Sequence, residues 1–130
     1  MINLPKKHRA DKKFMVKVWV NSNTKSNFKA LCISKHMSMS DLGSLMVIEA
    51  IDNFAEKRIE DALEERLKGY NRLNFSKEGY EIIAILLTDK HWQKLGNYAV
   101  IFNTSVAKVG TALFNYFLQT DEMRRLWSKD

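Results

Sequence analysis

The chain has 130 residues, of which 45% are hydrophobic, and carries a formal net charge of +6 at pH 7. This length suits one ordinary domain or two small units that share a core, and the apolar content predicts a packed interior. No apolar run is long enough to span a bilayer, and residues 1–13 lack the apolar core of a signal peptide. We therefore expect a cytoplasmic protein without a membrane partner.

The residues that usually support catalysis or metal binding are sparse and scattered. Cys32 is the only cysteine, and its helical spacing with Phe28 predicts a buried structural thiol. The three histidines have neither an i, i+4 pair nor ligand-type neighbours. No nucleophile and base arrangement, glycine-rich phosphate loop or carboxylate pair stands out either. We therefore expect no catalytic residues, no metal and no cofactor.

Positive charge is concentrated near the start of the chain. Residues 1–35 contain one acidic residue, Asp11, and nine basic ones, which are Lys6, Lys7, Arg9, Lys12, Lys13, Lys17, Lys25, Lys29 and Lys35. Such a segment attracts phosphate backbones through counterion release. A solvated lysine surface is the competing interpretation, so charge alone does not identify the partner.

The first element expected in chain order is a strand over residues 14–20, which is rich in β-branched and aromatic residues. Alternation places every second residue on its core face, namely Val16, Val18 and Val20. Residues 21–23 supply capping side chains, and the apolar spacing that follows predicts a short helix that ends near Lys35.

A second helix is expected after a break at residues 36–40. Ser38 and Ser40 are both suitable N-caps, and the apolar pattern continues to Phe54. Residues 59–79 are expected to prolong this helix as far as Gly69 and then to form a linker.

The second half of the chain repeats this order. Residues 81–87 predict a strand, Thr88 caps a helix that runs to Phe102, and residues 121–130 predict a helical tail. A shift of 67 residues, without a gap, places Ile83 on Val16, Ile85 on Val18, Leu95 on Phe28, Ala99 on Cys32, Ser105 on Ser38 and Gly110 on Gly43. The match predicts an internal structural repeat. An ordinary α+β domain with both strands in one sheet remains the alternative.

One strand and two helices cannot bury both faces of the strand, so each half needs a second such unit. Strand, short helix, serine-capped turn and second helix resemble the ribbon-helix-helix family, to which Arc and the methionine repressor belong. The resemblance implies a mainly α fold with a short antiparallel β-ribbon, built from two tandem units as an intrachain or interchain pseudo-dimer. Its boundaries would be a basic arm at 1–12, unit 1 at 13–58, the extension and linker at 59–79, unit 2 at 80–120 and the tail at 121–130.

In that family the ribbon enters the major groove of double-stranded DNA. A tandem copy is similar to the conjugation accessory proteins of the TraY kind. The resemblance therefore implies a transcriptional repressor, or a relaxosome accessory protein at the transfer origin of a conjugative plasmid. A relaxase or another DNA-processing protein would then be a second partner, and the number of chains on DNA stays open.

The ribbon residues expected to face DNA are those that alternate away from the core. In the first strand these are Met15, Lys17 and Trp19, and the matching residues of the second strand are Ile82, Ala84 and Leu86. Lys17 can donate to guanine, whereas the others can at best contact thymine methyl groups. The family normally presents polar readers here, so two alternatives stay open. Either the second strand is covered by the arm, the tail or another protein, or the apolar face is itself a protein-docking surface.

Phosphate contacts are expected where the second helices begin, because a helix N-terminus can bind an anion through its free N–H groups. The residues at these places are Ser38 and Ser40 in the first half and Thr104, Ser105 and Lys108 in the second. Lys12, the last residue of the basic arm, and Lys13, the first residue of unit 1, are expected to follow the DNA backbone. Helix capping without any ligand is the alternative role for the serines.

Overall fold

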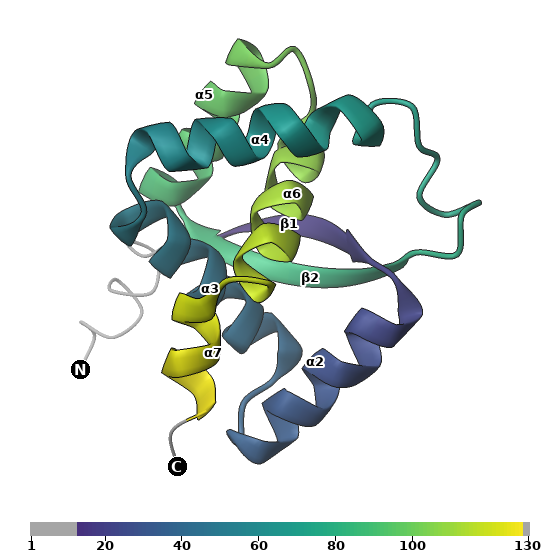
Figure 1. The fold of residues 1–130 in the computed structure, drawn as a ribbon, viewed down its shortest axis with the longest axis vertical. Coiled ribbons are helices and arrows are strands. Elements are labelled where there is room, and N and C mark those ends of the chain that lie inside the picture. Colours follow the sequence, from purple (N-terminus) through teal and green to yellow (C-terminus); the bar gives the residue numbers. More distant parts are fainter. Residues whose placement is uncertain (1–12, 129–130) are drawn as a thin grey trace, which may run out of the picture.

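The computed structural model describes residues 13–128, which form two strands and six helices (Figure 1). In chain order these are β1 (Lys13–Val20), α2 (Ser22–Ser34), α3 (Met39–Asn53), α4 (Glu56–Tyr70), β2 (Glu81–Thr88), α5 (Asp89–Ile101), α6 (Val106–Leu118) and α7 (Asp121–Ser128). The expected mainly helical fold with a short antiparallel ribbon is confirmed. None of the described helices has the length and apolar character needed to cross a membrane.

The ribbon forms within one chain. β1 and β2 pair antiparallel, with Lys13 opposite Thr88 and Val20 opposite Glu81. At the centre Lys17 lies opposite Ala84, and these two positions are 67 residues apart. The expected core face is confirmed, since every second residue is at most 4% exposed, namely Val16, Val18, Val20, Ile83, Ile85 and Leu87.

The offset of 67 residues also relates the helices and the turns between them. α2 and α5 both span 13 residues and begin 67 positions apart, as do the first residues of α3 and α6. His36 and Asn103, which follow α2 and α5, have matching left-handed φ angles of 57° and 53°. α2 and α5, and the starts of α3 and α6, therefore keep the 67-residue offset, whereas β1 and β2 begin 68 positions apart.

Side-chain caps begin the two second helices at the expected places. Ser38 Oγ accepts a hydrogen bond from Asp41 N (3.0 Å), and Ser105 Oγ accepts one from Lys108 N (3.1 Å). Ser38 and not Ser40 is therefore the cap of α3, because Ser40 already lies inside the helix.

The second helix does not continue into residues 59–68, which corrects one expectation. Phe54 is extended (φ −83°, ψ 144°), and a separate helix, α4, begins at Glu56 and runs past Gly69 to Tyr70. The break lets α4 fold back across α6, so that its apolar stripe of Ile59, Leu63 and Leu67 becomes buried. A straight extension of α3 would leave this stripe without the surface that α6 provides.

Each second helix packs on the strand of the other half, α3 on β2 and α6 on β1. Glycine allows this close approach in both helices. A Cβ atom added at Gly43 would lie 2.8 Å from Ile85 Cγ2, and one added at Gly110 would lie 3.0 Å from Val16 Cγ1. The helices thus approach the ribbon more closely than a larger residue would allow.

Arg58 of α4 connects α6 and α7. Its Nε donates to the Tyr116 hydroxyl (2.8 Å), and its two terminal nitrogens donate to the Glu122 carboxylate (2.6 and 3.0 Å). Hydrogen bonding from Arg58 is the main reason that the pKa of Glu122 falls from an ordinary 4.5 to about 2.

Replacing Glu122 by Gln should make stability less sensitive to acid. A carboxyl group with a depressed folded-state pKa stabilises the protein above pH 4.5, and this contribution is lost as the pH falls towards about 2. Urea unfolding at about pH 6 should therefore give a larger free energy of unfolding for the wild type than for Glu122→Gln. This difference should shrink as the pH falls below about 4.5. Glu65→Gln, on the exposed side of α4, is the control. A gap that does not change with pH would refute the ion-pair explanation.

Candidate nucleic-acid interface

The outer face of the ribbon consists of four cross-strand pairs, which are Lys13 with Thr88, Met15 with Leu86, Lys17 with Ala84, and Trp19 with Ile82. Paired residues point to the same side of a sheet, so one surface carries all six residues expected to face DNA. The two lysines are exposed, Met15 is 59% exposed, and Ile82 and Leu86 are 37% exposed each. The result is a mostly apolar strip with a lysine at its centre and another at one end.

The described residues do not bury β2 on both faces. Ala84 is half-buried, but Ile82 and Leu86, the next outward-facing residues of β2, are each 37% exposed. The tail helix α7 does not cover them, because its Met123 faces α2. The basic arm at 1–12, which includes Lys12, was also expected as a cover of β2, but it lies outside the described residues. Coverage of β2 by another protein is the remaining alternative.

The linker between α4 and β2 covers one end of the strip. Trp19 stacks on Phe75 of this linker, with ring centroids 5.7 Å apart and an interplanar angle of 13°. Tyr70 and Tyr80 pack edge-on against Phe75, which is itself buried. Trp19 is therefore half-buried, and the more open part of the strip is the end that carries Lys13 and Met15.

Two hydroxyl groups hold the outer edges of the ribbon, and neither was identified from the sequence. Leu86 N donates to Ser44 Oγ of α3 (2.7 Å), and Trp19 N donates to Thr111 Oγ1 of α6 (3.0 Å). The hydroxyls in turn donate to carbonyls one turn back in their helices (2.6 and 2.7 Å). The shift of 67 residues places Ser44 on Thr111, so this pair of hydroxyls was a signal that the sequence contained.

The N-termini of α3 and α6 differ in charge. Asp41 lies in the first turn of α3, whereas the equivalent residue of α6 is Lys108. Ser38 and Ser105 are exposed caps, and Thr104 donates to Asn71 Oδ1 (2.9 Å). Since a negative side chain competes with a phosphate for a helix N-terminus, α6 is the better placed of the two.

A polar groove of about 280 Å³ lies where α2 meets the start of α3, and it is lined by Ser22, Lys25, Ser26, Lys29, Met39 and Glu81. Two of these lining residues, Lys25 and Lys29, are basic. Glu81 accepts from Ser22 Oγ (2.7 Å) and lies 3.5 Å from Lys25 Nζ, and both contacts lower the Glu81 pKa. In the other half, the positions of Lys25 and Glu81 are taken by Trp92 and Phe14, whose rings stack at 4.7 Å.

Among the described residues, no group of three histidine, cysteine or acidic side chains is placed to hold a metal ion. Comparisons of the chain with protein-family models, with curated proteins and with solved structures found no match.

Proposed function

We propose that this protein binds double-stranded DNA by inserting its ribbon into the major groove. The observation that carries the proposal is the ribbon itself, a two-stranded antiparallel sheet with one solvent-exposed face and a lysine at its centre. B-form DNA has a major groove wide enough for a two-stranded ribbon. In the proposed complex, the N-terminus of α3 and the N-terminus of α6 contact DNA phosphates.

In this proposal the two halves, 13–58 and 80–120, are tandem ribbon-helix-helix units that form a pseudo-dimer within one chain. Lys17 pairs with Ala84, which is also its equivalent at the 67-residue offset. An approximate two-fold axis that relates the two halves would pass through such a pair of equivalent residues. The hydroxyl contacts of Ser44 and Thr111 obey the same relation. The packing of α3 on β2 and of α6 on β1, each on the strand of the other half, also supports the pseudo-dimer.

In this proposal each kind of residue on the face has its own role. The Lys17 ammonium is a donor for guanine O6 or N7, while Met15 and Leu86 offer apolar contact to thymine methyl groups. Lys13, Lys25 and Lys29 are cations for the phosphate backbone. This binding mode suits a transcriptional repressor and a relaxosome accessory protein alike, and in the second case a relaxase is the additional partner.

Lys17→Ala should weaken binding to the preferred DNA site by about 1–3 kcal/mol, because a direct base contact carries discrimination of that size. Fluorescence anisotropy with a fragment selected from the DNA that flanks the gene measures this loss against random DNA. Lys57→Ala is the matched control, since Lys57 is exposed on α4, beyond α6 from the ribbon. Unchanged preference for the selected fragment would remove Lys17 from the reading surface.

A protein-docking function is the second candidate, and the exposure of Met15, Ile82 and Leu86 favours it. Salt separates the two functions. Affinity that depends on phosphate contacts should fall steeply between about 50 and 200 mM salt, whereas an apolar interface should respond little. Binding that ignores salt and needs no DNA would favour the docking function.

A further inference from the structure

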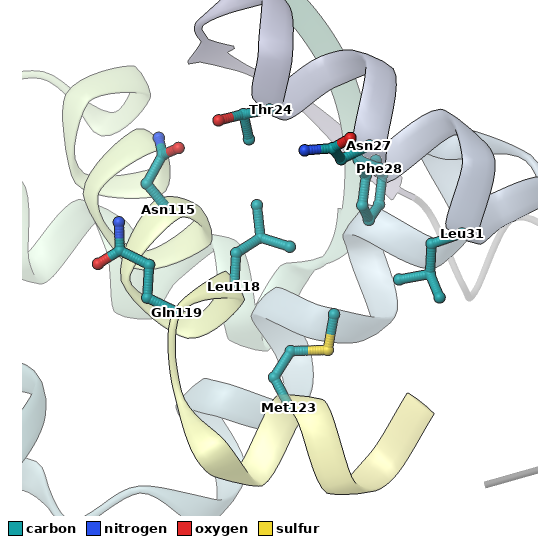
Figure 2. Close-up of a pocket in the computed structure, with 8 residues that line it drawn as sticks. All are labelled: Thr24, Asn27, Phe28, Leu31, Asn115, Leu118, Gln119 and Met123. Carbon is teal, nitrogen blue, oxygen red and sulfur yellow. The ribbon is translucent and has the colours of Figure 1, made fainter. Parts of the chain in front are cut away.

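A cleft of about 320 Å³ opens between α2, α6 and the start of α7, away from the ribbon's outer face (Figure 2). Thr24 and Asn27 of α2 face Asn115 of α6 and Gln119, the residue after α6, across it, and Met123 closes one side. Phe28, Leu31 and Leu118 supply the rest of its apolar lining. Its volume lies at the lower end of the range for small-molecule sites.

The equivalent place in the other half is filled by the protein's own side chains. At the 67-residue offset, Tyr98 takes the place of Leu31, and its ring is only 2% exposed. Its hydroxyl donates to Glu56 Oε2 (2.5 Å), and Lys94, the equivalent of Asn27, donates to Glu56 Oε1 (3.1 Å). His91, the equivalent of Thr24, is joined to Asp52 (2.9 Å). The open cleft exists because smaller side chains stand at these positions in α2.

Some polar atoms of the cleft already form hydrogen bonds within the protein, and this limits which atoms can bond to a ligand. Asn115 Nδ2 donates to the carbonyl oxygens of Trp19 (3.0 Å) and Thr111 (2.9 Å). Gln119 Oε1 accepts from Arg66 (2.6 Å). These bonds direct Asn115 Oδ1 as an acceptor and Gln119 Nε2 as a donor to a ligand. Among the residues that the structure describes, no charged side chain lines the cleft.

We propose that the cleft binds a small uncharged aromatic molecule that carries a hydroxyl or amide group. The ring takes the volume that Tyr98 fills in the other half, against Phe28 and Leu118, and its polar group bonds to the amides. A charged ligand is disfavoured, because it would give up hydration without meeting an opposite charge. The proposal concerns the free protein and does not depend on DNA binding.

The probe is p-cresol, which is the tyrosine side chain as a free molecule, titrated into the full ¹⁵N-labelled chain and followed by NMR. We expect saturable shifts at Thr24, Asn27 and the side-chain amides of Asn115 and Gln119. p-Toluate, of similar shape but charged, should bind at least about tenfold more weakly. Shifts that do not saturate, shifts confined to other surfaces, or equal binding of p-toluate would overturn the proposal.

Filling the cleft provides the second test. Leu31→Tyr introduces the ring found at the equivalent position, and it should reduce p-cresol affinity at least about tenfold. Ile33→Tyr is the matched control, because Ile33 is on the same helix but 67% exposed and not part of the lining. Asn27→Lys, at an exposed position, reproduces the other half without altering the core and should also weaken binding. If both cleft variants bind p-cresol as wild type does, the site is elsewhere.

Discussion

Phe114→Ala should lower the free energy of unfolding by about 3–5 kcal/mol, the usual cost of truncating a buried phenylalanine. Phe114 is fully buried in α6 and packs edge-to-face on Phe28, with ring centroids 5.2 Å apart and an interplanar angle of 83°. It also lies beside Gly43, so its ring fills the space where α2, α3 and α6 meet. The smaller side chain would lose these contacts and leave a cavity at that point.

Urea unfolding followed by circular dichroism measures this loss, and Phe102→Ala is the control. Phe102 follows α5 and is only partly buried, so the same truncation should cost clearly less there. A domain of this size is typically stable by only about 5–15 kcal/mol, so a loss of this size is a large share of the total stability. Equal losses at the two positions would show that α6 does not organise the core as described.

Gly43→Val should cost about 3 kcal/mol, because the new side chain collides with the ribbon. The Cβ atom alone would lie 2.8 Å from Ile85 Cγ2 and 3.4 Å from Phe114 Cε1, and two methyl groups extend beyond it. Ile85 cannot retreat, since it is fully buried and its strand is held by pairing with Val16. The helix must therefore move away from β2, which also strains the bond between Ser44 and Leu86.

The same substitution at Gly96 is the matched control for the same unfolding measurement. Gly96 lies within α5, and a Cβ atom there would meet nothing within 4 Å. Valine and glycine have similar helix propensities, within a few tenths of a kcal/mol, so Gly96→Val should be nearly neutral. If both variants lost the same stability, helix propensity and not close packing would explain the effect at Gly43.

Local chemistry was sufficient to predict most of the elements. Alternation of Val16, Val18 and Val20 identified the first strand and its buried face, and Ser38 and Ser105 marked the starts of the second helices. These signals lie within a few residues of the structure that they specify. The 67-residue offset added a long-range expectation, which the starts of the paired helices and the strand register match.

The features that sequence patterns missed depend on contacts between distant residues. The break before α4 is fixed by the surface of α6, about 50 positions further along the chain, and not by a breaking residue at Phe54 or Ala55. Phe75 lies in the segment expected to be a linker, and local patterns gave no sign that its ring stacks on Trp19. In both cases tertiary packing decides between local conformations that the sequence alone allows.

The hydroxyl contacts of Ser44 and Thr111 also bear on self-association. A two-stranded sheet has two open edges, and each is a template on which another chain can add a strand. Here one outward N–H on each strand is occupied by a helix hydroxyl, and on β1 the carbonyl of the same residue, Trp19, is occupied by Asn115. An incoming strand would have to displace these bonds to align along either edge, so the helices that bury the inner face also discourage amyloid-like growth.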